Sequence, residues 1–268
     1  MKVKIGITGC TGSLGRIILK KKGYKFVCFK GDIRKKKDVQ NWLSENDLEA
    51  IIHLAAIVPI RTVNANKKKA LDVNFNGTKN LVDEILNYNI KWFFFSSTSH
   101  VYGSSTKKIS EKKKTKPISY YGKTKLLSEN YIKSKLKNKI GFCIGRIFST
   151  SNISQKKNYL VPDLLRKIRL SKTKIKLTNL NHFRDFISMN EIADIILKFY
   201  KINFNGTINI GRGKGILLKN IALQIAKKYK KKIEFIDNNK STFLVADNKK
   251  LKKYINLKTK TNLKKLIF

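Results

Sequence analysis

The sequence predicts an α/β fold, a doubly wound parallel sheet with a smaller C-terminal lobe. Through the first 150 residues, short apolar runs alternate with amphipathic segments of helix length, the order typical of βαβ units. A glycine-rich turn follows the first apolar run directly. From Phe148 the alternation loosens and a polar, lysine-rich stretch follows. We therefore expect a nucleotide-binding domain over residues 1–148 and a substrate-binding lobe over 149–268, some segments of which return to the first domain.

The predicted elements follow one another regularly, because uninterrupted apolar runs indicate buried strands and apolar residues three or four apart indicate helix faces. In the first domain, strands are expected at 3–8, 25–29, 50–55, 91–96 and 140–147, and helices at 13–22, 38–46, 70–88 and 119–136. In the second lobe, strands are expected at 175–177 and 206–210, and helices at 161–168, 191–200 and 217–228.

The formal net charge of +42 rests almost entirely on lysine, since only eight of the 59 basic residues are arginines. Nucleic-acid readers usually need arginine for bidentate contacts to bases and phosphates. Here the lysines are spread along the whole chain, which favours a solvated lysine coat. The remote alternative is a lysine-rich nucleic-acid-binding module, whose affinity would fall steeply with salt. We expect no specific nucleic-acid partner.

Several classes of protein are excluded by composition. Hydrophobic residues make up 41% of the chain, enough for a sizeable core. No apolar run reaches the roughly 20 residues of a membrane helix, and no secretory signal is visible. The three cysteines, Cys10, Cys28 and Cys143, are odd in number and far apart, so we expect neither a disulfide framework nor a C-x-x-C site, and no metal. A cytoplasmic protein without a membrane partner is predicted.

The glycine-rich turn is Gly9-x-x-Gly12-x-x-Gly15, between a predicted strand and a predicted helix. Glycines at this spacing let the backbone turn tightly and approach a dinucleotide diphosphate at the start of the helix. Asp32 follows 17 residues after Gly15, where a carboxylate could accept hydrogen bonds from the adenosine ribose.

Two other interpretations of this acidic position stay open. The basic residues Arg16, Lys30 and Arg34 could instead serve a 2′-phosphate, so both NAD and NADP are candidates. Asp32 could also merely cap the helix that begins near Lys36.

A second constellation joins the hydroxyl-rich segment 96–103 (SSTSHVYG) to the segment 117–125 (PISYYGKTK). Tyr121 and Lys125 are four residues apart and share a helix face, where the cation would lower the pKa of the phenol. The spacing alone is weak, because roughly two chance matches are expected in so lysine-rich a chain. Tyr131/Lys135 and Tyr254/Lys258 also match, but only Tyr121 has the hydroxyl-rich strand end and the P-x-S-x prefix before it.

Together these residues resemble the extended short-chain dehydrogenase/reductases that act on nucleotide sugars, a family with a Rossmann-type sheet. The resemblance covers nearly the whole chain and is carried by TGCTGSLG (8–15), IIHLAA (51–56), VNFNGT (73–78), SSTSHVYG, YYGKTK and FRDFIS (183–188).

The resemblance implies a role for each matching residue. The catalytic set would be Thr98, Tyr121 and Lys125. Thr98 would donate a hydrogen bond to the reacting oxygen, Tyr121 would exchange the proton with it, and Lys125 would hold the nicotinamide ribose. The cofactor, NAD or NADP, would contact Tyr121 and Lys125. It would also contact Gly9, Thr11, Gly12, Ser13, Leu14, Gly15, Arg16, Asp32, Ile33, Leu54, Ala55, Ala56 and Asn74. The substrate would contact His100, Ser149 and Arg184. A homodimer is a further expectation of the resemblance.

Departures from the family pattern favour one reaction over others. Ser99 and His100 replace the acid pair of the 4,6-dehydratases, which argues against a dehydratase; His100 is a substrate contact or simply a buried histidine. The segment between Gly15 and Asp32 is much shorter than in UDP-galactose 4-epimerases, and if GDIR (31–34) aligns with their later strand, Asp32 would meet the adenine. The short first half resembles more closely that of the 4-keto-6-deoxyhexose reductases. Ser149 stands where the family often has Asn. We expect reduction of an NDP-4-keto-6-deoxyhexose at C4, with an NDP-sugar 4-epimerase as the alternative and a non-catalytic, cofactor-sensing relative as a third hypothesis.

Overall fold

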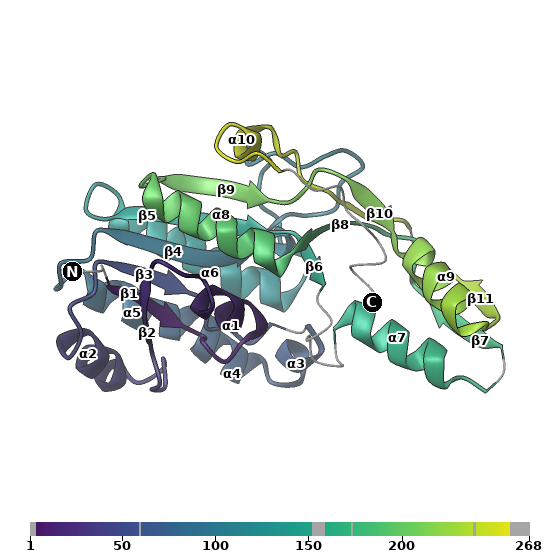
Figure 1. The fold of residues 1–268 in the computed structure, drawn as a ribbon, viewed down its shortest axis with the longest axis horizontal. Helices are drawn as coiled ribbons and strands as arrows, with labels where there is room; N and C mark the ends of the chain where they lie inside the picture. The colour runs from purple at the N-terminus through teal and green to yellow at the C-terminus, as the bar shows by residue number, and fades with distance from the viewer. Residues whose placement is uncertain (1–3, 59, 152–158, 173, 238–239, 258–268) are drawn as a thin grey trace. The chain divides into compact units, whose positions relative to one another are not determined.

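The computed structural model describes residues 4–58, 60–151, 159–172, 174–237 and 240–257 (Figure 1). The chain divides into two compact units. The first contains residues 1–103, 114–147 and 190–208, and the second contains 104–113, 148–189 and 209–268.

The first unit is built on a six-stranded sheet with the order β2-β1-β3-β4-β5-β9. The strands are β1 (Lys4–Thr8), β2 (Lys25–Cys28), β3 (Ala50–His53), β4 (Trp92–Thr98), β5 (Gly141–Ile147) and β9 (Gly206–Ile210). The four pairings from β2 to β5 are parallel, and along them β1 faces β2 on one side and β3 on the other. The predicted parallel sheet is therefore confirmed.

The helices of this unit lie around the sheet, and the longer ones pack against it through an apolar face (Figure 1). The helices are α1 (Ser13–Leu19), α2 (Lys36–Ser44), α3 (Ile60–Ala65), α4 (Lys67–Leu71), α5 (Gly77–Ile85), α6 (Tyr120–Leu136) and α8 (Met189–Lys201). One core cluster joins α2, α5 and α6 to the strands, with Leu81 and Ile132 packing beside Phe93, Phe95 and Ile144. Each of these side chains is fully buried.

The single long helix predicted over 70–88 is wrong in its middle. A π-helical segment, η1 (Asp72–Asn76), separates α4 from α5. The wider turn leaves Asn74 fully buried, although the sequence pattern alone marks it as one more helical position. Such π segments are rare and are found frequently at functional sites.

The strand order places a switch point beside the glycine-rich turn. From β1 the chain runs outward to the edge strand β2 and then returns to the other side of β1, where β3 lies. In doubly wound sheets a ligand-binding crevice forms outside the carboxyl ends of two strands that diverge in this way. In this sheet one strand lies outside β1, whereas the usual six-stranded order has two, so Gly31 and Asp32 lead from β2 into α2.

The second unit contains short strands and two amphipathic helices. Its elements are β6 (Ser149–Ser151), α7 (Leu160–Leu170), β7 (Ile175–Thr178), β8 (Phe183–Ser188), β10 (Gly215–Leu217), α9 (Leu218–Tyr229), β11 (Ile233–Ile236), β12 (Phe243–Leu244) and α10 (Lys249–Lys252). Strand β8 is central, since β6, β10 and β12 all pair with it. Leu164 and Ile168 of α7 and Ile221 and Ile225 of α9 form its core with Phe186. Among the described residues, no helix has both the length and the apolar character needed to cross a membrane.

Candidate active site

The glycine-rich turn packs too closely for side chains at two positions. Gly9 has φ +77°, and a Cβ on it would lie 2.7 Å from the backbone nitrogen of Ala55. A Cβ on Gly15 would lie 2.5 Å from the carbonyl oxygen of Gly9. Gly12 is less confined and is the N-cap of α1, with no side-chain cap. The backbone of this turn is therefore left open, as a close-approaching diphosphate requires.

A cavity of about 740 Å³ begins at this turn and lies entirely in the first unit. Its walls come from the turn, from the end of β2 and the segment after it, from the segment after β3, and from α4 and η1. The lining residues are Gly9, Cys10, Thr11, Cys28, Phe29, Lys30, Gly31, Asp32, Ile33, Arg34, Ala55, Lys69 and Val73. The cavity lies at the switch point of the sheet, where a dinucleotide would bind.

Asp32 faces this cavity and is paired with a cation two residues away. Its carboxylate accepts from Arg34 through Nε at 2.9 Å and through Nη2 at 2.5 Å. These hydrogen bonds lower the pKa of Asp32 to about 2. The N-cap of α2 is Lys35, and Asp38 accepts the backbone N–H of Asp32, so Asp32 does not cap this helix.

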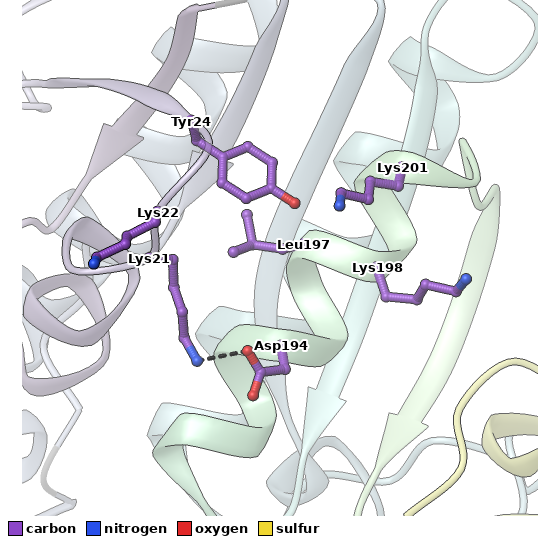
Figure 2. Close-up of a pocket in the computed structure, with 7 residues that line it drawn as sticks. All are labelled: Lys21, Lys22, Tyr24, Asp194, Leu197, Lys198 and Lys201. Carbon is purple, nitrogen blue, oxygen red and sulfur yellow. Dashed lines mark hydrogen bonds and ion pairs between the residues drawn. The ribbon is translucent and has the colours of Figure 1, made fainter.

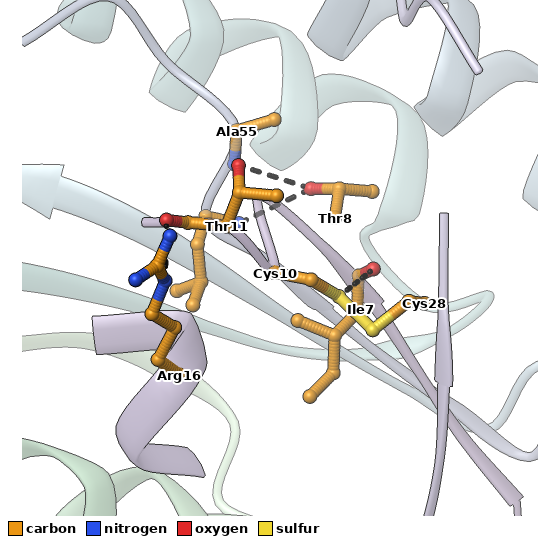
Figure 3. The surroundings of a disulfide bond; sticks show 8 residues. Ile7, Thr8, Cys10, Thr11, Arg16, Cys28 and Ala55 are labelled. Carbon is orange, nitrogen blue, oxygen red and sulfur yellow. Dashed lines mark hydrogen bonds between the residues drawn. A yellow bond between two sulfur atoms is a disulfide. The ribbon is translucent and has the colours of Figure 1, made fainter. Parts of the chain in front are cut away.

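Two cysteines meet at the same cavity, contrary to the expectation from the sequence. A disulfide joins Cys10 and Cys28, whose Cα atoms are 6.0 Å apart (Figure 3). The expectation failed because β1 and β2 are neighbouring parallel strands, with Ile7 opposite Cys28, so residues 18 apart in the chain lie side by side. Cys143 is buried and is not part of this disulfide.

The hydroxyl-rich strand end and the start of α6 come together at Thr98, His100 and Tyr121. The Thr98 hydroxyl accepts the backbone N–H of His100 at 3.2 Å and begins the 3-10 turn η2 (Ser99–Val101). The rings of His100 and Tyr121 lie edge to face, with centroids 6.0 Å apart. A Cβ on Gly122 would overlap the carbonyl oxygen of His100, so only glycine allows this close contact. Sequence reasoning assigned no role to Gly122.

Lys125 lies one turn further along α6 and is almost completely buried. Its side chain reaches a residue of β4, because Nζ lies 3.9 Å from the centroid of the Phe95 ring. Burial lowers the pKa of Lys125 to about 7, although the nearby carboxylate of Glu129 acts in the opposite direction. A buried amine poised near neutrality beside Tyr121 distinguishes this helix face from a surface lysine pair.

Behind these residues lies a buried polar network that sequence reasoning missed. Glu129 has no exposed surface and accepts from Arg146 at 2.6 Å and from Ser97 at 2.5 Å. Arg146 also donates to the hydroxyl of Tyr102 at 2.8 Å. The network therefore joins α6 to both strands, β4 and β5, and to the turn that follows Thr98. The spacing of eight residues from Tyr121 to Glu129, two helical turns, was the available signal.

A second buried chain of hydrogen bonds passes behind the glycine-rich turn. Thr78 donates its hydroxyl to the carbonyl of Asn74 at 2.7 Å, so the Nε2 atom of His53, 2.9 Å away, is the donor to Thr78. The Nδ1 atom of His53 then accepts from Thr8 at 2.6 Å. Burial, and secondarily the charge of Lys125, lowers the pKa of His53 to about 3, so this histidine is neutral.

Asn74 holds the backbone beyond β3 in place. Its side-chain oxygen accepts the N–H of Ile57 at 2.7 Å, and its amide donates to the carbonyl of the same residue at 3.0 Å. The amide also lies 3.2 Å from the hydroxyl of Thr124 on α6. Asn74 thereby ties the segment after β3 to the helix that carries Tyr121 and Lys125.

The remaining candidates for cofactor contact lie around the same turn. Arg16 donates from Nε to the carbonyl of Thr11 at 3.1 Å, which braces the turn (Figure 3). The backbone N–H groups of Leu54 and Ala55 both donate to the Thr8 hydroxyl at 3.2 Å. Ser13 and Leu14 begin α1, Ala56 follows β3, and Ile33 is buried in the cavity wall.

The competing Tyr-x-x-x-Lys match at Tyr131 has a different environment. Its hydroxyl donates to the carboxylate of Asp83, and burial together with this bond raises the pKa of Tyr131 to about 12. Lys135 lies over the ring of Tyr131, with Nζ 5.7 Å from the centroid. Lys258, the partner of Tyr254 in the third match, is outside the described residues.

Ser149 and Arg184 lie together in the second unit. Ser149 on β6 is paired in register with Phe186 on β8, two residues beyond Arg184. The Arg184 guanidinium donates a hydrogen bond of 2.9 Å to the hydroxyl of Thr242. Burial lowers the pKa of Arg184 to about 10. His100, the other candidate substrate contact, belongs to the first unit.

A second hollow in the first unit contains none of these candidates. It has a volume of about 260 Å³ and lies between the end of α1 and α8 (Figure 2). Lys21 pairs with Asp194 at 2.5 Å, and Lys201 lies over the ring of Tyr24. The lysines here belong to the general coat. Across the part of the chain that the structure describes, no three His, Cys, Asp or Glu side chains are placed to hold a metal ion.

Comparison with known proteins agrees with this geometry. The model of the NAD dependent epimerase/dehydratase family matches residues 5–211. The GDP-6-deoxy-D-talose 4-dehydrogenase of Aggregatibacter actinomycetemcomitans is 32% identical over 225 residues, 80% of this chain and 76% of that protein. The UDP-glucose 4-epimerase of Rhizobium meliloti is 24% identical over 94% of this chain and 90% of its own length.

A solved structure shares the fold over almost the full length. The dTDP-4-dehydrorhamnose reductase of Clostridium acetobutylicum superposes with a TM-score of 0.86 at 22% identity, covering 99% of this chain and 97% of that one. The family model covers well over half of the sequence, including every candidate of the first unit. This chain belongs to the NAD-dependent epimerase/dehydratase family.

Proposed function

We propose that this chain is an NAD(P)-dependent oxidoreductase that reduces the C4 keto group of a nucleotide-linked 4-keto-6-deoxyhexose. The observation that carries the proposal is the buried Lys125, one helical turn from Tyr121 and beside the strand that ends at Thr98. A lysine is rarely buried without a task, and its pKa of about 7 suits a group that acts near neutral pH.

The residues of the first unit fit a dinucleotide. The open backbone of Gly9, Gly12 and Gly15 accommodates the diphosphate, and the cavity beyond it has walls suited to an adenosine. Asp32 lines this cavity and Arg16 braces the turn through the carbonyl of Thr11, and we expect these two residues to meet the ribose or the base. The wider set of cofactor contacts is Thr11, Ser13, Leu14, Ile33, Leu54, Ala55, Ala56 and Asn74. The nicotinamide, when bound, supplies the hydride for the carbonyl carbon.

Each catalytic residue then has a distinct task. Tyr121 donates a proton to the C4 oxygen as the keto group becomes a hydroxyl. Thr98 donates a hydrogen bond to the same oxygen and so stabilises the negative charge that develops on it. Lys125, when protonated, favours the phenolate that Tyr121 becomes and holds the nicotinamide ribose.

The substrate would be recognised by its sugar and by its diphosphate separately. His100 stands against the Tyr121 ring, where it meets the sugar. Arg184 and Ser149 lie on adjacent strands of the second unit, and a guanidinium is suited to a diphosphate. In the present structure Arg184 donates to Thr242, so substrate binding would exchange these hydrogen bonds for phosphate contacts.

The preference for a reductase rests on the relative that is 32% identical, whose name describes a 4-dehydrogenase of a nucleotide-linked 6-deoxyhexose. Oxidation of that C4 hydroxyl and reduction of the C4 ketone are the same reaction in opposite directions. An NDP-sugar 4-epimerase with tightly bound NAD is the second candidate, favoured by the similarity to a UDP-glucose 4-epimerase over 94% of the chain.

The test is the loss of NADH and NADPH absorbance with a panel of nucleotide-linked 4-keto-6-deoxyhexoses. Tyr121→Phe is the variant and Tyr131→Phe the matched control, because both tyrosines lie on α6 four residues before a lysine. We expect wild type and the control to oxidise one of the two cofactors, and Tyr121→Phe to lose at least about 100-fold in kcat. Purified protein that retains NAD and interconverts NDP-sugars without net oxidation would replace the reductase with the epimerase.

A further inference from the structure

The disulfide between Cys10 and Cys28 occupies an unusual place in this fold. Cys10 lies inside the glycine-rich turn, between Gly9 and Thr11, and Cys28 is the last residue of β2. The bond therefore links the turn to the start of the segment that carries Asp32. Both cysteines line the same cavity. A ligand in this cavity would contact the bond or the backbone that it holds.

The same site accommodates the reduced form of Cys10. The sulfur of Cys10 lies 3.2 Å from the carbonyl oxygen of Ile7, within reach of an S–H donor. A thiol at this position would have an acceptor, whereas the disulfide sulfur makes only a contact there. Reduction thus leaves the Cys10 thiol with an acceptor, and the turn accommodates both redox states of this residue.

The surroundings favour exchange with a thiol or disulfide from solution. Cys28 is half-buried and opens on the cavity, whose wall carries the cations Lys30, Arg34 and Lys69. The carboxylate of Asp32 is already paired with Arg34. Neighbouring cations favour the thiolate, which is the nucleophile of thiol–disulfide exchange, and they attract an anionic disulfide such as that of glutathione.

We propose that Cys10 and Cys28 form a reversible redox modification site that is coupled to the occupancy of the dinucleotide cavity. This proposal rests on the proposed function only in taking the cavity to bind a dinucleotide. In the oxidising direction, one cysteine thiolate attacks a sulfur of glutathione disulfide and releases one glutathione thiolate. The second cysteine then attacks the mixed disulfide and releases the other, so two electrons pass to glutathione and the two protons of the cysteines end on its thiols.

The coupling has a definite sign. The disulfide holds the glycine-rich turn against the end of β2, and these two segments supply most of the residues that line the cavity. The oxidised protein therefore binds the dinucleotide more tightly, since less freedom is lost on binding. Because coupling is reciprocal, the dinucleotide must favour the disulfide by the same factor.

The experiment uses the full chain equilibrated in buffers with a series of ratios of reduced to oxidised glutathione. Free thiols are trapped with N-ethylmaleimide and located by mass spectrometry, with and without saturating NADH or NADPH. Affinities of the oxidised and reduced protein are measured separately from nicotinamide fluorescence. We expect Cys10 and Cys28 to titrate together, the midpoint ratio to shift about fivefold with dinucleotide, and the affinity to fall by the same factor on reduction. Cys143→Ser serves as the control variant and should titrate like wild type.

The possible failures are distinguishable. The modification site is overturned if the disulfide stays intact in buffer with reduced glutathione alone, or if it never forms in buffer with oxidised glutathione alone. Either result leaves the proposed function untouched. A reversible bond whose midpoint and dinucleotide affinity are independent of each other overturns the coupling. Absence of dinucleotide binding in both redox states would instead reject the proposed function. Cys28→Ser, in which no bond can form, should have the affinity of the reduced wild type.

Discussion

Lys125 is a buried amine whose presence costs stability, and its replacement gives a sharp test of the site. It is 2% exposed, and burial lowers its pKa from 10.5 to about 7. Methionine has a similar length without the charge. We expect Lys125→Met to abolish reduction of the keto sugar and, at the same time, to raise the free energy of unfolding, because functional groups are often held at the expense of stability.

The magnitude follows from the pKa. One pKa unit corresponds to about 1.4 kcal/mol, so a pKa of about 7 in place of 10.5 implies a cost of up to about 5 kcal/mol for holding the lysine charged in the fold. At pH 6, where Lys125 is protonated in the folded and the unfolded chain alike, the variant should gain about 2–5 kcal/mol. The gain is smaller if the new side chain packs imperfectly against Phe95.

The gain must shrink as the pH rises. Above pH 7 the folded wild type releases the Lys125 proton, whereas the unfolded chain keeps it up to about pH 10.5. The unfolded state then binds more protons than the folded state, so the free energy of unfolding of the wild type rises by about 1.4 kcal/mol per pH unit. The free energy of unfolding of the variant does not contain this pH-dependent contribution, because the variant has no amine at position 125. Between pH 7 and pH 9 the difference between the two proteins should fall by roughly 2–3 kcal/mol.

Urea unfolding at pH 6, 7, 8 and 9 measures both quantities, on protein without bound dinucleotide. The control is Lys123→Met, which changes an exposed lysine on the same helix and should alter stability by less than about 0.5 kcal/mol at every pH. A Lys125→Met protein that is less stable than wild type at pH 6, or a difference that does not change with pH, would refute the reasoning.

Three further predictions concern the buried ion pair of Glu129, the start of α6 and the disulfide. Glu129→Gln leaves the buried Arg146 without its charged partner and should cost about 3–5 kcal/mol in urea unfolding, so a loss below about 1 kcal/mol would contradict the assigned ion pair. Gly122→Ala forces a Cβ against the carbonyl of His100, and a shift of about 1 Å at the start of α6 should lower kcat/KM by about 100-fold; an alanine variant with wild-type kcat/KM would show that the contact relaxes freely. Reduction of the disulfide, which spans 18 residues, should lower the free energy of unfolding by about 3 kcal/mol, and equal stability of the two redox forms would argue against a formed bond.

Local sequence patterns were sufficient for the fold class, and they also nominated the residues of the candidate site. The alternation of apolar runs and helix faces is a local property, and it correctly predicted the strands of the parallel sheet. The turn at Gly9, Gly12 and Gly15 was recognisable because strand, turn and helix follow one another directly along the chain. The context of Tyr121 was also local, and it separated this tyrosine from Tyr131, although their spacing to a lysine is identical.

Tertiary structure alone decided which distant residues share an environment. Cys10 and Cys28 meet because β1 and β2 are neighbours, and sequence distance carries no information about which strands pair. The expected continuous helix over 70–88 was interrupted because the buried Asn74 bonds the backbone beyond β3, a contact that helical periodicity does not encode. Burial, which shifts the pKa of Lys125 far more than any neighbour in the chain does, depends on the elements packed above it. The sequence by itself determined the order of the strands and main helices of the parallel sheet, while packing between elements set the charges and contacts on which the proposed chemistry depends.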